Sequence, residues 1–223
     1  MQRAEHPPRS SLLARLRRHW LILLLAATCI LVELALVGAE RGVWGSTRWR
    51  VLAYLNGGFW AGLVRAGWEG NFALQPITMF FSHPLLHAGF AHLATNVIAL
   101  LALGAAVRMR AGQTGLAVVL LAACLGGGAA FAAVGPLGQP MVGVSAGLFG
   151  LAAALMVWQA RASRKAGRRM WDMVGLATGL MLANLASAWA MNWQLAWEAH
   201  VGGFVAGGLA AMAISLGWDR RRA

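Results

Sequence analysis

The chain has 223 residues, of which 59% are hydrophobic and 12% are charged, and it carries a formal net charge of +12. Soluble globular domains are nearer half apolar and a quarter charged, so this composition indicates a protein that uses the lipid bilayer as its solvent. The two cysteines, Cys29 and Cys124, both fall in apolar runs, which excludes a disulfide scaffold and a cysteine-rich metal site.

Six apolar runs approach the roughly 20 residues that a transmembrane helix needs. They cover residues 20–38, 85–107, 115–134, 143–160, 173–191 and 199–217. The first run is a poor signal peptide, because five further apolar runs follow it rather than a soluble mature domain. We therefore predict an all-α membrane protein. Its core, residues 20–217, is a bundle of six transmembrane helices between a basic N-terminus (1–19) and a basic tail (218–223).

The positive charge marks one side of the predicted bundle. Fifteen of the 19 lysines and arginines lie at the N-terminus, after the second and fourth apolar runs, and at the C-terminus. The positive-inside rule assigns these four positions to the cytoplasm. We expect a multi-pass cell-membrane protein with both termini cytoplasmic, in the inner membrane of a prokaryote. Because no soluble basic domain is visible, nucleic acid is not an expected partner.

The segment between the first two runs, residues 40–81, is long for a simple connection and rich in aromatic residues. Tryptophan and tyrosine favour the interface between membrane and water. We predict a partly helical element that lies in the outer interface. The alternative is a floppy external loop.

Four polar residues fall at comparable depth in the predicted bundle. Ser145 stands in a Gly-Val-Ser-Ala-Gly segment at the start of the fourth run, His92 lies early in the second, and His200 lies at the start of the sixth. These three spans run in one direction, so at about 1.5 Å per residue all three side chains should fall in the outer half of the membrane. Asn96 follows His92 by four residues and shares its helix face.

This set of residues suits nucleophilic catalysis. A serine hydroxyl needs a nearby base, and His200 can accept the proton of Ser145 and later return it. Glu198 points to another face of a helix, so we infer a dyad rather than a triad. The Asn96 amide, a His92 N–H group and the Ser145 backbone N–H group could stabilise an oxyanion.

Glycines in the fourth and sixth runs favour close helix packing. Gly203 and Gly207 form a small-xxx-small pair below the histidine of the sixth run. Gly143 and Gly147 flank Ser145. Close packing of these two spans would bring the serine and the histidine within hydrogen-bonding distance.

Each signal also has a simpler interpretation. A G-x-S-x-G segment in a glycine-rich membrane protein can reflect helix packing alone, and His92 and Asn96 can form interhelical hydrogen bonds. A soluble α/β-hydrolase carries the same serine motif on a strand-to-helix turn, but no strand pattern is visible. For Glu33, in the first run, we expect a structural role. His83, His87 and His92 lack a carboxylate or cysteine to complete a ligand set, so a metal is not expected.

Three segments carry a family resemblance. Residues 82–96 read S-H-P-L-L-H-A-G-F-A-H-L-A-T-N, in which an H-x-x-x-N pattern is preceded by a histidine five residues earlier. Residues 143–150 read G-V-S-A-G-L-F-G, and residues 199–207 read A-H-V-G-G-F-V-A-G. In this order and spacing they resemble the signatures of the rhomboid intramembrane serine proteases, and the resemblance covers the six-span core.

The resemblance implies a helical bundle with a water-filled cavity that opens outward. It implies Ser145 as nucleophile, His200 as general base, and His92 with Asn96 at the oxyanion. The substrates it implies are proteins with a transmembrane helix, cleaved near small residues at the outer end of that helix without a cofactor. The oligomeric state is left open.

The chain departs from the family pattern at three places, one of which is Ala146, where members often have a glycine after the serine. Many members have a Trp-Arg pair shortly before the second span, where this chain has Thr78-Met79, and its own Trp49-Arg50 pair lies far upstream. Phe149 stands where some members have a tyrosine, so a ring can still pack there without the hydroxyl.

Three functions compete on this evidence. The leading hypothesis is an active protease. Its compact six-span core resembles that of the rhombosortase subgroup, whose members process C-terminal Gly-Gly sorting tails. The second is a non-catalytic rhomboid-like protein that binds or escorts transmembrane clients, although such proteins generally lose the serine or the histidine. A small transporter would show inverted repeats, and no convincing repeat relates the two halves.

Overall fold

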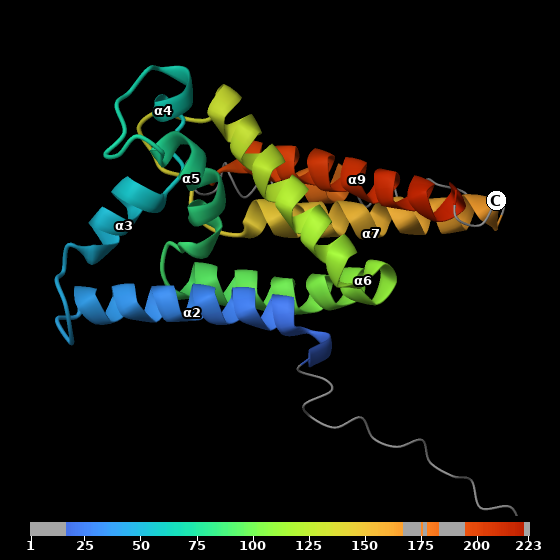
Figure 1. Cartoon of the computed structure of the whole chain (residues 1–223), viewed down its shortest axis with the longest axis horizontal. Coiled ribbons are helices and arrows are strands. Elements are labelled where there is room, and N and C mark those ends of the chain that lie inside the picture. Colours follow the sequence, from blue (N-terminus) through green and yellow to red (C-terminus); the bar gives the residue numbers. More distant parts are fainter. Residues whose placement is uncertain (1–16, 167–174, 176–177, 183–194, 221–223) are drawn as a thin grey trace, which may run out of the picture.

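The computed structural model describes residues 17–166, 175, 178–182 and 195–220 of the chain. This part is helical and holds no β-strand (Figure 1). Its elements are α2 (Trp20–Glu40), α3 (Trp49–Gly57), α4 (Gly62–Arg65), α5 (Gln75–Ser82), the 3₁₀ turn η1 (His83–Leu85), α6 (Phe90–Val134), α7 (Ser145–Lys165) and α9 (Trp197–Arg220). The predicted fold class, an all-α membrane bundle, is confirmed.

Three of the described helices are long and apolar enough to cross a membrane: Trp20–Glu40, Phe90–Val134 and Trp197–Trp218. The second has 45 residues and is two helices joined at Gly112, whose φ of 71° and ψ of −175° are not helical. The chain turns back at this glycine (Figure 1), so the two halves of α6 match the predicted second and third spans. Helix α7 corresponds to the predicted fourth span. The predicted fifth span, residues 173–191, lies mostly outside the described residues.

One end of the bundle gathers the start of α2, the turn at Gly112, the end of α7 and the end of α9 (Figure 1). This end carries the basic residues that flank the spans, and we call it the basic end. Helices α3, α4 and α5 lie at the opposite end, beside the starts of α7 and α9 (Figure 1). The chain direction therefore places the start of each of these two helices far from the basic end.

Helices α6, α7 and α9 approach one another through small residues. A side chain at Gly203 of α9 would lie closer than 3 Å to the carbonyl oxygen of Ala146 in α7, and one at Gly207 would lie as close to the backbone of Gly150. Such close backbone approach between helices is available only where small residues face each other. The glycines thus set the separation of α7 and α9.

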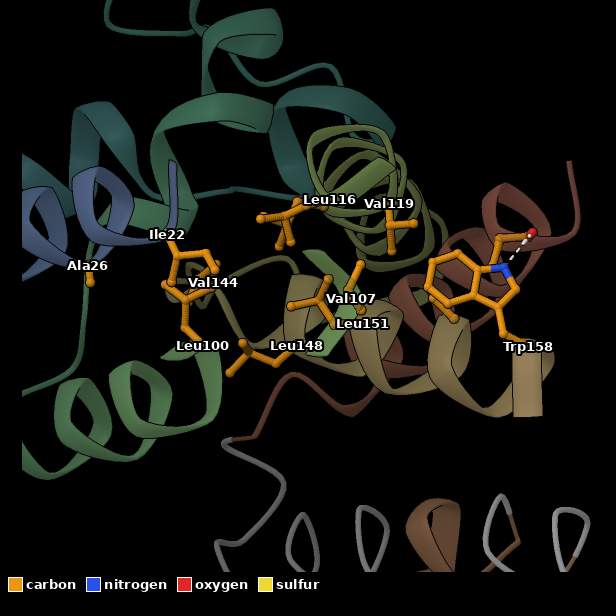
Figure 2. Close-up of a cluster of buried hydrophobic side chains, with 13 residues drawn as sticks. Ile22, Ala26, Leu100, Val107, Leu116, Val119, Val144, Leu148, Leu151 and Trp158 are labelled. Atoms are coloured by element: carbon orange, nitrogen blue, oxygen red, sulfur yellow. Dashed lines mark hydrogen bonds between the residues drawn. The ribbon is translucent and has the colours of Figure 1, made fainter. Parts of the chain in front are cut away.

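A cluster of buried apolar side chains fills the space between these helices and α2. Figure 2 shows Ile22 of α2, Leu100 and Leu116 from the two halves of α6, and Leu151 of α7 within it. Toward the basic end, the indole N–H group of Trp158 donates a 3.0 Å hydrogen bond to the carbonyl oxygen of Ala211 in α9. This core holds the helices in register.

The predicted interfacial segment, residues 40–81, together with Ser82 forms the three short helices α3, α4 and α5. Their anchor is Phe59, which is fully buried and packs edge-on against Phe80, His83 and Phe131 at centroid distances of 4.7, 5.7 and 6.0 Å. An aromatic side chain buried on this scale contributes a large share of the packing energy of a small element. The segment is thereby fixed to the second half of α6.

Candidate active site

The Ser145 hydroxyl and the His200 ring lie at the centre of the site. Ser145 is the first residue of α7 and His200 lies in the first turn of α9. The His200 Nε2 atom is 2.9 Å from the Ser145 Oγ atom, which is hydrogen-bonding distance. His200 is 5% exposed and Ser145 is half-buried. Two residues 55 positions apart are thus brought together by the close packing of their helices.

Gly127, in the second half of α6, explains how both residues are held. A side chain at this position would lie 2.6 Å from the Ala146 Cβ atom and 2.9 Å from the Ala199 carbonyl oxygen. Ala146 follows the serine and Ala199 precedes the histidine. Because Gly127 has no side chain, the starts of α7 and α9 can both pack against the second half of α6 at this position. The sequence pattern alone does not single out this glycine.

The imidazole of His200 is stacked on a second ring. The Phe149 and His200 ring centroids are 4.3 Å apart and their planes differ by 10°. Phe149 follows Ser145 by four residues, so it lies one helical turn below the serine on the same face of α7. The stack restricts the orientation of the imidazole.

The loop before α7 is fixed by the segment that contains α3 to α5. Phe59 and Met141 exchange two backbone hydrogen bonds of 2.9 Å, forming an isolated β-bridge. The Gly143 N–H group donates to the carbonyl oxygen of His83 at 2.9 Å. These three bonds set the path of the chain as it enters Ser145.

Two side-chain nitrogens approach the same loop from α6. A side chain at Gly143 would lie 2.9 Å from His92 Nε2 and 3.4 Å from Asn96 Nδ2. The backbone N–H group of Ala88 donates to His92 Nδ1 at 3.3 Å, which assigns the proton of a neutral ring to Nε2. Asn96 is 4% exposed, and its Nδ2 atom has no hydrogen-bond partner in the described part of the chain.

Gly143 makes room for these donors. Its φ of 109° lies in the region that favours glycine. The sequence predicts a helix-packing role for Gly143 and Gly147. In the structure Gly143 lies in the loop before α7, and Gly147 faces Leu120 and Cys124 of α6 rather than α9. The close contact of α7 with α9 is made through Gly203 and Gly207, which the sequence also predicts as packing residues and which face Ala146 and Gly150.

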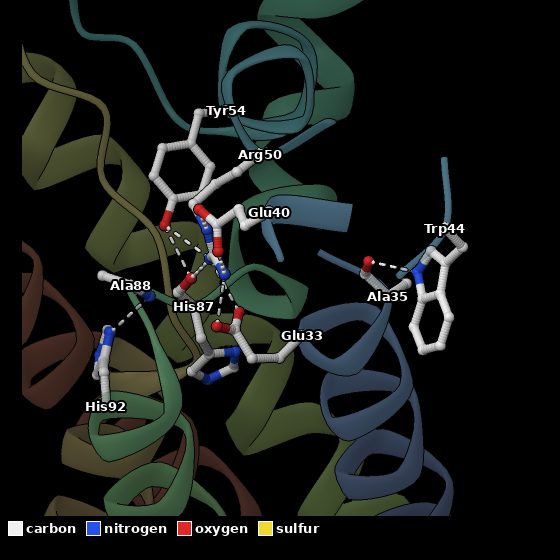
Figure 3. A network of polar contacts seen from close by, with 9 residues as sticks. All are labelled: Glu33, Ala35, Glu40, Trp44, Arg50, Tyr54, His87, Ala88 and His92. Atoms are coloured by element: carbon white, nitrogen blue, oxygen red, sulfur yellow. Dashed lines mark hydrogen bonds and ion pairs between the residues drawn. The ribbon is translucent and has the colours of Figure 1, made fainter. Parts of the chain in front are cut away.

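An ion-pair network lies beside the start of α6 (Figure 3). Arg50 Nη2 is 2.8 Å from Glu33 Oε1, and Arg50 Nη1 donates to Glu33 Oε2 at 3.1 Å. The Arg50 Nε atom is 2.6 Å from Glu40 Oε1. The carbonyl oxygen of His87 accepts two bonds of 2.8 Å, from Arg50 Nη1 and from the Tyr54 hydroxyl.

Arg50 therefore joins α3 to α2 and to the turn that precedes α6. Along the chain, the Trp49-Arg50 pair lies far upstream of the position where many family members have a Trp-Arg pair, yet α3 brings Arg50 to the turn before α6. The structural role expected for Glu33 agrees with this pairing. A buried glutamate in an apolar helix requires a cation, and this requirement is the signal that could have identified Arg50.

The remaining titratable residues near the site make fewer contacts. The ring nitrogens of His83 and His87 are buried and have no hydrogen-bond partner among the described residues. No group of three metal-ligating side chains occurs in the described ranges. Glu198 Oε2 also has no partner within them, so this oxygen does not orient His200.

Comparison with known proteins agrees with the fold. The profile of the Rhomboid domain matches residues 75–217 of this chain. The "Uncharacterized protein ML1171" of Mycobacterium leprae (strain TN) is 30% identical over 149 residues, which are 63% of this chain and 57% of that protein. The "Rhomboid protease GluP" of Bacillus subtilis (strain 168) is 32% identical over 132 residues, which are 59% of this chain and 25% of that protein.

The chain thus aligns with little more than half of one relative and a quarter of the other. The profile match includes α6, α7 and α9, and with them the residues Ser145, His200, His92 and Asn96. Since this match covers well over half of the 223 residues, the chain belongs to the rhomboid family and is a multi-pass helical membrane protein.

Proposed function

We propose that the chain is an intramembrane serine endopeptidase that hydrolyses peptide bonds of membrane-anchored proteins through a Ser145–His200 dyad. The observation that carries the proposal is the 2.9 Å separation of His200 Nε2 and Ser145 Oγ. A serine becomes a nucleophile when a base lies within hydrogen-bonding reach, and few other roles require that pair at the start of two packed helices.

In the proposed reaction the Ser145 Oγ atom attacks the scissile carbonyl carbon while His200 Nε2 takes the hydroxyl proton. The tetrahedral intermediate collapses, the C–N bond breaks, and His200 returns the proton to the leaving amine. Water then attacks the acyl-enzyme, with His200 again as the base, and releases the free serine. The Phe149 ring keeps the imidazole facing the serine in both steps.

The oxyanion would meet three donors. The backbone N–H group of Ser145 belongs to the first residue of α7, and the first N–H groups of a helix lack intrahelical partners. The Asn96 Nδ2 atom has no partner in the described part of the chain, and the His92 Nε2 proton lies beside the same loop. Donors held in place before the reaction are the most effective form of transition-state stabilisation.

The substrates we propose are single-span membrane proteins, cut near small residues at the outer end of their helix. Both termini are proposed to be cytoplasmic, because the basic end gathers the residues that the positive-inside rule assigns to that side. The active site then lies in the outer half of the cell membrane. Membership of the rhombosortase subgroup stays a prediction.

The test is cleavage in reconstituted vesicles. The parent chain is mixed with single-span proteins that carry glycine and alanine near the outer end of the helix, and fragments are identified by mass spectrometry. Cleavage should disappear with Ser145→Ala and with His200→Ala, and it should persist with Ser163→Ala at the far end of α7. Cleavage that survives Ser145→Ala would exclude this serine as the nucleophile.

A further inference from the structure

An apolar pocket of about 370 Å³ lies between α2 and the second half of α6, and its inner wall includes Val144, the residue before Ser145. Its walls include Leu25 and Thr28 of α2, Ala117 and Leu121 of α6, and Phe81 of α5. Phe81 and Leu121 are about half exposed, at 56% and 49%, so the pocket opens onto the outer surface of the bundle. Its lining has almost no polar groups, which suits a hydrocarbon chain rather than a peptide or a polar metabolite.

A group of cations stands one helical turn from this pocket, at the basic end. Arg108 Nη1 and Gln113 Nε2 both donate 2.8 Å hydrogen bonds to the carbonyl oxygen of Arg18. Arg18 precedes the pocket residue Leu21 by three positions, and Gln113 precedes Ala117 by four. One helical turn is about 5.4 Å, so the end of the pocket formed by Leu21 and Ala117 lies about one turn from these cations.

The local charge at this place is positive. Arg17 and Arg18 are exposed, and Arg108 Nε has no hydrogen-bond partner in the described part of the chain. Burial and the positive charges of Arg108 and Arg18 lower the pKa of the neighbouring His19. Among the described residues, the glutamates occur in the half of α2 beyond the pocket, in residues 40–81 and at the start of α9. An anion is therefore favoured here.

We propose that this pocket binds one acyl chain of an anionic phospholipid, whose phosphate pairs with Arg17, Arg18 and Arg108. Arginine is well suited to phosphate because its N–H groups can bind two oxygens at once. The lipid would come from the leaflet that faces the basic end, since the α2 and third-span residues that line the pocket lie in the halves of these helices nearest that end. Its headgroup would cross-link α2 to the turn at Gly112. This proposal does not depend on proteolysis.

The experiment measures the melting temperature of the detergent-purified chain during titration with phosphatidylglycerol, or with phosphatidylcholine of the same acyl chains. Native mass spectrometry of the same samples counts retained lipid. Phosphatidylglycerol should raise the melting temperature by at least about 3 °C, because a ligand that binds only the folded state stabilises it. Phosphatidylcholine should raise it by less than half as much, and inorganic phosphate should have no effect.

Two pairs of variants distinguish the contribution of the apolar pocket to lipid binding from the contribution of the arginines. Ala117→Trp fills the pocket from an exposed position and should abolish the shift, whereas Val118→Trp, on the neighbouring exposed residue outside the pocket, should retain it. Arg17→Gln with Arg18→Gln should remove the preference for phosphatidylglycerol, while Arg41→Gln at the opposite end should not. Equal shifts with both lipids, an equal shift with inorganic phosphate, or a full shift in Ala117→Trp would each overturn the proposal.

Discussion

Phe149 stacks face to face on His200, with ring centroids 4.3 Å apart and planes inclined by only 10°. The contact leaves the imidazole with its Nε2 atom 2.9 Å from the Ser145 hydroxyl. Because the two rings come from different helices, Phe149 couples the position of the base to the helix that carries the nucleophile.

The stack predicts a graded effect of substitution. Phe149→Leu removes the flat surface and should lower kcat about tenfold with a smaller change in KM, because a misoriented base slows proton transfer rather than substrate binding. Phe149→Tyr retains the ring and should keep activity close to the parent. Steady-state kinetics of both variants on one cleaved test protein make the comparison. Equal losses in the two variants would mean that the ring has no positioning role.

Asn96 is expected to act in the transition state. Asn96→Ala removes a buried donor that has no partner in the described part of the chain. We expect kcat to fall by about 100-fold while KM stays within a few fold, as for other single oxyanion donors. Asn56→Ala, at an exposed asparagine of α3, is the matched control. A main effect on KM would instead indicate that Asn96 binds substrate or only supports the fold.

Gly143 should not tolerate alanine. The new methyl group would lie 2.8 Å from His92 Cε1 and 2.9 Å from His92 Nε2, at a φ of 109° that L-residues rarely adopt. The backbone strain is worth roughly 1–3 kcal/mol, so both thermal stability and cleavage should fall. Gly138→Ala lies in the same loop, has open space around it and should behave like the parent. Parent-like cleavage by Gly143→Ala would show that the loop geometry is not required.

Tyr54 gives a pH-dependent signal that can be assigned without ambiguity, because it is the only tyrosine in the chain. Burial raises the pKa of Tyr54 above its ordinary value of about 10. The folded state therefore holds the phenolic proton more strongly than the unfolded state. The resulting stability is fully present below about pH 10 and is lost as the pH rises through the higher folded-state pKa.

The measurement is the ultraviolet absorbance of tyrosinate during alkaline titration, with and without denaturant. The native midpoint should lie above the denatured one, and the decline of the melting temperature at alkaline pH should be smaller in Tyr54→Phe. Coincident midpoints would contradict the burial of the Tyr54 hydroxyl, which donates a partly buried hydrogen bond to the His87 carbonyl oxygen.

Much of the fold could be predicted because it follows from hydrophobic length and charge. Two apolar runs separated by the polar residues around Gly112 predict two antiparallel spans, and the structure turns at that glycine. The approach of Ser145 and His200 could also be anticipated. Both residues stand at the start of spans that run in one direction, and small residues let those spans pack closely.

The unpredicted features depend on how the chain folds back on itself between spans. Arg50 lies 17 residues from Glu33 along the chain, and no helical periodicity links them. Their ion pair forms only because α3 returns across the end of α2 (Figure 3). The role of Gly143 was missed for a similar reason, since its φ and its distance from His92 come from the bridge between Phe59 and Met141.

The central claim is that Ser145 is an activated nucleophile whose base is His200. The most direct measurement is labelling of the detergent-purified chain with a fluorophosphonate probe, with the modified residue identified by mass spectrometry. The account predicts labelling of Ser145 in the parent and in Ser163→Ala, and none in Ser145→Ala or His200→Ala. An unlabelled but folded parent, or labelling that persists in His200→Ala at the parent rate, would contradict it.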